Sequence, residues 1–258
     1  MPVSALEVFR EGEAHAVKRE WVPEVPVALE FNGLAYAVMM ATPCDLDDFV
    51  RGFAITEGLA DNVEEIENIA IAETDKGFIA RAQLSGLGIE QLGERVRTRV
   101  AESSCGLCGI ENLEAVARPL PTVTADREVA PQAVFAALTN LRAHQKLNAQ
   151  TGAAHGAGLA DHEGKILCLR EDVGRHNAVD KLVGALAHAQ VDIANGFVLS
   201  TARCSFEIVE KVVRAGGTAL VTISLPTTMA VERVREARLQ MFCLARHDSY
   251  LVPGAVAE

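Results

Sequence analysis

The chain has 258 residues, of which 49% are hydrophobic and 5% aromatic, and its formal net charge is −11. This length and composition are typical of a globular protein with an aliphatic core and one large or two modest domains. The negative charge argues against a nucleic-acid partner, because surfaces that bind duplexes neutralise phosphates with Lys and Arg. Residues 1–21 contain no uninterrupted apolar run, so we expect no signal peptide, no membrane span and a cytoplasmic protein.

The first hundred residues are predicted to form an α+β lobe. Alternating apolar residues on either side of Asn32-Gly33, a favoured two-residue turn, predict a β-hairpin. Apolar residues at helical spacing follow from Leu46 until Gly58, and this amphipathic helix is expected to pack on the hairpin. The predicted strands cover residues 25–31, 34–40, 66–72 and 78–84.

The pattern changes after a plausible linker at Pro119-Leu120-Pro121, so we expect domains over residues 1–118 and 119–258. In the second domain, short apolar runs alternate with helical patterns. Such alternation predicts a largely parallel sheet that is covered on both faces. The predicted strands cover residues 166–169, 197–200, 219–223 and 239–244, and the predicted helices cover residues 131–150, 178–187, 206–214 and 228–238.

Two thiols, Cys105 and Cys108, form a C-x-x-C pair among small residues. Such a pair serves as half of a zinc site, as a dithiol/disulfide switch or as a sulfur-carrying thiolate. The other four cysteines are scattered singly, so no second zinc half-site is visible, and the context does not fit a thioredoxin-like motif. Cytoplasmic cysteines stay reduced, which disfavours a structural disulfide. The spacing alone does not choose between carrier, redox and structural roles.

Polar residues follow three predicted strands of the second domain. The strand over residues 166–169 runs into the segment 170–181, and the next two strands lead to residues 200–207 and 224–228. The carboxyl ends of parallel strands meet at one edge of a sheet, where α/β proteins bind ligands. We therefore expect an anion pocket, built from Arg175, Lys181, Arg203, Ser205 and Thr227. Taken singly, each has a plainer interpretation: Ser205 as a helix cap, Asp172 as a turn residue and His176 as a surface histidine.

The thiol loop and the segment Arg170-Glu171-Asp172-Val173-Gly174-Arg175-His176-Asn177-Ala178-Val179-Asp180-Lys181 together resemble the formate dehydrogenase accessory sulfurtransferase family (FdhD). Thr151-Gly152-Ala153-Ala154-His155 and Ser205-Phe206-Glu207 add to the match, which runs from about residue 26 to 250. The resemblance implies an α/β fold with a cytidine-deaminase-like three-layer α/β/α C-terminal domain and a smaller N-terminal α+β lobe. It also implies a homodimer.

For activity, the resemblance implies that Cys105 accepts a sulfane sulfur from a cysteine desulfurase as a persulfide. The sulfur would pass to the molybdenum or tungsten bis-pterin guanine dinucleotide cofactor of formate dehydrogenase. Cys108 would relay, protect or resolve the persulfide, and the sequence does not decide between these roles. The alternatives are a chaperone that binds the cofactor without obligatory sulfur transfer and a thiol-disulfide oxidoreductase.

The family's cofactor-binding segment near the C-terminus corresponds to six consecutive residues. Met241 precedes it where the family usually has glycine, and Ala153 also replaces a common glycine. Zinc deaminases need H-x-E and P-C-x-x-C ligands, which this chain lacks, so no zinc is expected. The residues expected to bind molybdenum bis(molybdopterin guanine dinucleotide) are Phe242, Cys243, Leu244, Ala245, Arg246, His247, His155, Arg175, His176, Lys181, Arg203 and Ser205.

Overall fold

The computed structural model describes residues 3–95, 119–125 and 127–254. A four-stranded sheet in the order β4-β3-β6-β5 forms the N-terminal lobe. Its turn at Asn32 and Gly33 has φ values of 50° and 79°, the positive values that a tight hairpin turn requires. The two predicted strand pairs are confirmed as β3 (Val25–Phe31) with β4 (Leu34–Ala41) and β5 (Ile66–Thr74) with β6 (Gly77–Leu84).

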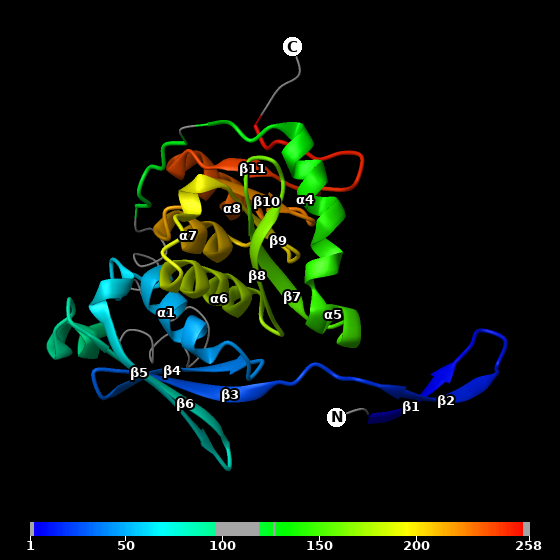
Figure 1. Ribbon diagram of the computed structural model, residues 1–258, viewed down its shortest axis with the longest axis horizontal. Coiled ribbons are helices and arrows are strands. Elements are labelled where there is room, and N and C mark those ends of the chain that lie inside the picture. The colour runs from blue at the N-terminus through cyan, green and yellow to red at the C-terminus, as the bar shows by residue number, and fades with distance from the viewer. Residues whose placement is uncertain (1–2, 96–118, 126, 255–258) are drawn as a thin grey trace.

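Helix α1 (Leu46–Thr56) confirms the predicted helix and lies between the N-terminal sheet and the second domain (Figure 1). Phe53 stacks on Phe31 of β3 and meets Tyr36 of β4 edge to face, so α1 does pack on the hairpin. Its other side packs on α6 (Arg175–His188). The helix is therefore buried on both sides, which joins the two lobes.

A further hairpin, β1 (Val3–Val8) with β2 (Ala14–Arg19), was not predicted. It lies apart from both larger sheets in Figure 1. Leu6 and Val8 of this hairpin remain 65% and 66% exposed. The apolar alternation that signals a half-buried strand is weak here, because the hairpin packs against no core within the described residues.

The second domain holds a five-stranded sheet in the order β11-β10-β9-β7-β8. Strand β7 was missed, because its sequence His-Gly-Ala-Gly-Leu-Ala lacks the branched residues that mark a strand. It runs antiparallel to both neighbours, whereas β9, β10 and β11 run parallel to one another. The strands are β7 (His155–Ala160), β8 (Ile166–Asp172), β9 (Phe197–Ser200), β10 (Ala219–Thr222) and β11 (Gln240–Phe242).

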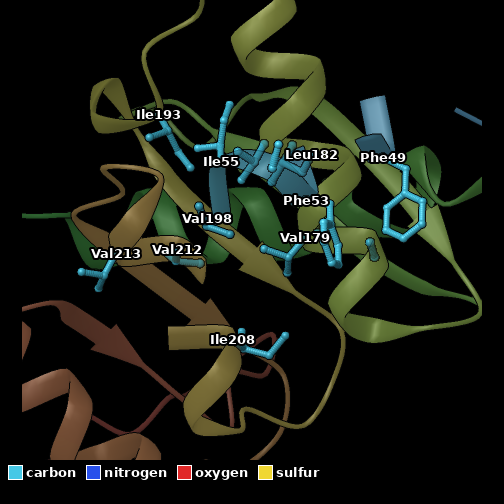
Figure 2. Packing of buried hydrophobic residues seen from close by; sticks show 14 of the residues in the cluster. Phe49, Phe53, Ile55, Val179, Leu182, Ile193, Val198, Ile208, Val212 and Val213 are labelled. Atoms are coloured by element: carbon cyan, nitrogen blue, oxygen red, sulfur yellow. The ribbon is translucent and has the colours of Figure 1, made fainter. Parts of the chain in front are cut away.

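Helices cover both faces of this sheet, as predicted (Figure 1). One face packs on α4 through Phe197 and Leu199 of β9, and the other packs on α6, α7 and α8. Figure 2 shows this second core, in which Val198 of β9 lies among side chains of α6 and α7. The predicted helix over residues 131–150 is interrupted at Gln145. The remaining helices are α4 (Pro131–His144), α5 (Lys146–Thr151), α7 (Phe206–Arg214) and α8 (Thr228–Ala237), with 3-10 turns at η1 (Val63–Glu65) and η2 (Ile193–Asn195).

Two glycines set the separation of α1 and α6. A Cβ atom at Gly52 would lie 1.6 Å from the backbone oxygen of Asp180, and one at Gly184 would lie 1.9 Å from that of Asp48. No side chain fits at either position, because the obstacle is backbone on the facing helix. The close packing of α1 on α6 therefore depends on this glycine pair.

A buried ion pair in the second domain forms another connection to the first lobe through Thr42. Lys181 Nζ lies 2.6 Å from Asp172 Oδ2, and both side chains have no exposed surface. The same two groups bind Thr42, in the loop before α1: Thr42 N donates to Asp172 at 3.0 Å, and Lys181 donates to Thr42 O at 2.9 Å. Asn177 donates to Asp172 Oδ1 and to Met40 O. The segment 170–181 thus fastens the second domain to the β4–α1 loop.

We predict that Gly184→Ala destabilises the protein by about 1–3 kcal/mol, because the new methyl group overpacks the contact between α1 and α6. Urea unfolding followed by circular dichroism measures the change. Gly93→Ala is the matched control, since a Cβ at Gly93 meets nothing within 4 Å. Equal stability of the two variants would contradict the close contact.

We also predict that Lys181→Met costs about 3–5 kcal/mol, because it leaves the Asp172 carboxylate buried without its counter-ion. Arg81→Met is the control: its ion pair with Glu30 is half exposed and should contribute at most about 1 kcal/mol. If Lys181→Met unfolds at the same urea concentration as Arg81→Met, the buried pair is not what holds the lobes together.

Candidate functional site

The predicted pocket residues gather at one edge of the five-stranded sheet. β8, β9, β10 and β11 all end at this edge, and the antiparallel β7 begins there, with His155 paired to Asp172. Arg175 opens α6, and Ser205 directly precedes α7. Thr227 caps α8 through its side chain. The turns that follow β8, β9 and β10 therefore meet where the sequence predicted them to.

His176, Ser205 and Glu207 form a hydrogen-bonded cluster at this edge. His176 Nε2 lies 3.1 Å from Glu207 Oε2 and 3.3 Å from Ser205 Oγ, and Ser205 Oγ donates to Glu207 Oε2 at 2.9 Å. The hydrogen bond from His176 lowers the pKa of Glu207 to about 2, against an opposing effect of burial. Glu207 is therefore an anion at neutral pH.

Sequence reasoning did not single out Glu207 as a site residue. The available signal was its position two residues after Ser205, in the first turn of a helix that follows a strand. Its charge partly offsets the cations at this edge. Arg175 is among these cations, because its charge contributes to the lowered pKa of Glu207.

Arg175 is the cation best placed to meet an anion. Its Nε is buried and has no hydrogen-bond partner among the described residues. No side chain caps α6, whose first residue is Arg175, so the helix start adds free amide donors. Burial, followed by the charge of Arg175, lowers the pKa of His155, which is therefore neutral at pH 7. A phosphate-sized anion could accept hydrogen bonds both from the unpaired Arg175 Nε and from the first backbone amides of α6.

Lys181 was predicted to bind an anion, but its position in the structure leaves it no access to one. Its ammonium group is wholly buried and is held by Asp172 and Thr42. Asp172 is likewise a buried ion-pair partner and not a simple turn residue. Arg203 is exposed and makes no ion pair within the described part of the chain, so it is free to bind an anion.

The segment 242–247 serves mainly to shape the loop after β11. Phe242 packs edge to face on Tyr250 at 5.1 Å, and Cys243 exchanges two backbone hydrogen bonds with Leu251. Arg246 donates to the backbone oxygens of Ile223 and Ala245, although its side chain is partly exposed. Phe242, Cys243 and Ala245 are buried, Leu244 is partly buried, and Arg246 and His247 are exposed. Side-chain contact with a ligand is thus open chiefly to Arg246 and His247.

Four cysteines lie in the described residues: Cys44, Cys168, Cys204 and Cys243. Burial raises the pKa of each thiol, and that of Cys204 reaches about 12. None of them is a thiolate at neutral pH, so none has the form that attacks sulfur. Cys105 and Cys108 lie outside the described residues.

Neither a metal centre nor a membrane-spanning helix is found within the described ranges. No three His, Cys, Asp or Glu side chains gather there in a way that could hold a metal ion. No helix there is long and apolar enough to cross a membrane. The expected lack of zinc stays a prediction for the whole chain.

Known proteins resemble this chain over nearly its whole length. The sequence model of the FdhD/NarQ family matches residues 22–252. A relative from Xanthomonas axonopodis pv. citri, named sulfur carrier protein FdhD, is 40% identical over 247 residues, which cover 95% of this chain and 88% of the relative. A relative of the same name from Bordetella petrii is 40% identical over 224 residues, 87% of this chain and 81% of its own.

A solved structure shares the fold. It is the crystal structure of a protein from Desulfotalea psychrophila assigned as a formate dehydrogenase accessory protein. The two structures superpose with a TM-score of 0.74 and 21% identity, covering 98% of this chain and 95% of the other. At this identity the likeness shows the fold alone, whereas the sequence matches show the family. The chain belongs to the FdhD/NarQ family.

Proposed function

We propose that this protein is a sulfurtransferase that carries sulfane sulfur as a persulfide on Cys105. A cysteine desulfurase supplies the sulfur, and the acceptor is the molybdenum or tungsten bis-pterin guanine dinucleotide cofactor that formate dehydrogenase requires. Membership of the family and the relatives named as sulfur carriers support this role. We expect the protein to act in the cytoplasm, where its thiols stay reduced.

The protonation of the four described thiols supports the choice of the C-x-x-C pair. A persulfide carrier needs a thiolate, and desolvation raises the pKa of all four described thiols above the ordinary value. Cys44 illustrates the point, because its thiol is near Lys181, yet the effect of burial exceeds that of the charge. The C-x-x-C pair, Cys105 and Cys108, is therefore our candidate for the carrier role.

The transfer onto Cys105 is redox-neutral. The Cys105 thiolate attacks the outer sulfur of the donor's persulfide, the S–S bond of the donor breaks, and the donor cysteine leaves as a thiolate. The new S–S bond leaves the outer sulfur on Cys105. In a second displacement an electron-pair donor of the acceptor would attack the outer sulfur, the S–S bond to Cys105 would break, and Cys105 would leave as a thiolate. Cys108 is placed by sequence to relay or protect it.

The carboxyl edge of the five-stranded sheet supports an acceptor that carries phosphates. Arg175 has an unpaired, buried Nε at the start of α6, and the exposed Arg203 follows β9, which β7 separates from β8. The diphosphate groups of a guanine dinucleotide have the charge and size for such a site. We place the nucleotide end of the acceptor here, beside Arg175.

Two finer structural proposals accompany this function. We propose that the second domain is cytidine-deaminase-like, which its helix-covered five-stranded sheet with one antiparallel inner strand supports. We also propose a homodimer, to which the exposed apolar residues Leu6 and Val8 of the β1–β2 hairpin would contribute surface.

Mass spectrometry after incubation with a cysteine desulfurase and L-cysteine tests the carrier role. We predict one added sulfur atom on the peptide that contains Cys105, lost in Cys105→Ala and kept in Cys108→Ala. Cys44→Ala is the control and should keep the label, because the Cys44 thiol is protonated. An unlabelled Cys105 in the unsubstituted protein would favour a chaperone that binds the cofactor without carrying sulfur. Activity towards a generic protein disulfide would instead favour an oxidoreductase.

Isothermal titration calorimetry with guanosine diphosphate tests the anion site. We predict that Arg175→Gln weakens binding by about ten- to a hundredfold, the cost of losing a hydrogen bond to a charged group. Rising salt should weaken binding to the unsubstituted protein, and adenosine diphosphate should bind less well. Arg81→Gln, on the N-terminal sheet, is the control and should bind normally. Equal affinities of the two variants would show that the nucleotide binds elsewhere.

A further inference from the structure

A small pocket lies where the two lobes meet, at the ends of three helices. It is lined by Ile55 in the last turn of α1, by Ala187 in the last turn of α6 and by Ala215 directly after α7. Each of these helices therefore turns its C-terminus towards the pocket. Because helix C-termini carry a partial negative charge, the backbone around the pocket already favours a cation.

The inner surface of the pocket is apolar. It is formed by Ile55, Val183, Leu186 and Ile193, each at most 9% exposed, and Ile55 and Ile193 approach each other from opposite lobes (Figure 2). The exposed Val191 extends this apolar surface outwards. The volume of about 220 Å³ lies below the roughly 300–1,000 Å³ of small-molecule sites. The pocket therefore suits one inserted side chain better than a larger ligand.

The rim of the pocket is acidic. Asp61 and Glu64 come from the segment after α1, Asp192 directly precedes η2, and all three residues are exposed. Within the described residues no Lys or Arg lines the pocket, and none of these carboxylates makes an ion pair. Asp192 Oδ1 accepts a hydrogen bond from Ala194 N, whereas the carboxylates of Asp61 and Glu64 accept none in this part of the chain. Two carboxylates at the rim are thus available to a ligand.

The basic residues at the end of α7 do not balance this rim. Lys211 is buried and pairs with Asp180 at 2.9 Å and with Glu57 at 3.0 Å. Arg214 Nη1 lies near Gly58, but Arg214 does not line the pocket. Even if its charge is counted with the three carboxylates of the rim, the pocket stays negative.

We propose that this pocket receives an arginine side chain from an exposed segment of a partner protein. The aliphatic stem of the arginine would pack on Ile55 and Leu186, while its charged head stays at the rim, as in other long basic side chains on apolar surfaces. A guanidinium has five N–H donors, enough to bind both Asp61 and Glu64. Charge complementarity with an unbalanced rim thus fixes the class of side chain. The site lies at the opposite end of α6 from Arg175 and does not depend on sulfur transfer.

Nuclear magnetic resonance titration of the full-length protein tests this proposal with a capped tripeptide that has arginine between two leucines. We expect saturable shifts of the methyl signals of Val183, Leu186 and Ile193. A peptide with citrulline in place of arginine should bind at least about tenfold more weakly, because citrulline has a similar shape and no charge. Equal binding of the citrulline peptide, or shifts confined to other methyl groups, would overturn the proposal.

A second probe distinguishes a protein segment from a small molecule. Agmatine carries the stem and guanidinium of arginine without a peptide, so it lacks the leucines that would cover Val191. It should bind at least about tenfold more weakly than the arginine peptide. Agmatine that binds as tightly as the peptide would identify the occupant as a small cation and would exclude the partner segment.

Variants of the rim locate the peptide. Asp61→Asn combined with Glu64→Gln should weaken binding of the arginine peptide at least about tenfold, whereas Asp75→Asn, in the exposed β5–β6 turn, should not. Unchanged thermal unfolding of both proteins shows that the fold is intact. Normal peptide binding by the folded double variant would rule out the acidic rim as the binding site.

A last variant distinguishes a partner from this chain's own arginines. Arg97 and Arg99 lie outside the described residues and follow Arg95, which donates to the backbone oxygen of Gly58. Arg97→Gln combined with Arg99→Gln should leave the affinity for the arginine peptide unchanged. A gain of about tenfold or more would show that the chain fills its own pocket, and it would exclude the partner proposed here.

Discussion

The buried ion pair between Asp172 and Lys181 fixes the part of the lobe interface on which the proposed anion site is built. Neither charge reaches solvent, and each needs the other together with Thr42 from the opposite lobe. A buried pair of this kind adds little net stability compared with apolar residues, yet it is costly to break. It therefore fixes geometry: the end of β8, the start of α6 and the loop before α1 have one mutual arrangement. The anion site that we propose near Arg175 depends on that arrangement, and Gly52 and Gly184 allow α1 and α6 to come close enough for the arrangement to form.

Periodicity was a reliable guide wherever an element buries one face. Helix α7 was predicted to the residue because its apolar positions recur at helical spacing. Strand β9 was predicted to the residue because it is a short apolar run, buried on both faces, between helical patterns. β7 was missed, because small residues and glycines leave no such pattern. The segment 170–181 was misread for another reason. Charged residues usually indicate a surface, and nothing local reveals that the partners of Lys181 and Asp172 include Thr42, about 130 residues away in the chain.

The candidate site was predicted in outline and corrected in detail. Parallel strands must end at one edge, so the meeting of Arg175, His176 and Ser205 followed from topology alone. The charge state and availability of individual groups could not be predicted, because they depend on side chains that the fold brings together. Lys181 is paired with Asp172 in the core, and Glu207 is an anion beside His176. The loop after β11 shows the same limit, since Phe242 and Cys243 mainly support its backbone.

A crystal structure of the protein with bound guanosine diphosphate tests most directly whether the carboxyl edge of the five-stranded sheet holds the nucleotide end of the sulfur acceptor. The phosphates are expected within hydrogen-bond distance of the Arg175 guanidinium and the first amides of α6, with Lys181 still buried against Asp172. Phosphates bound away from Arg175 would contradict this placement of the site.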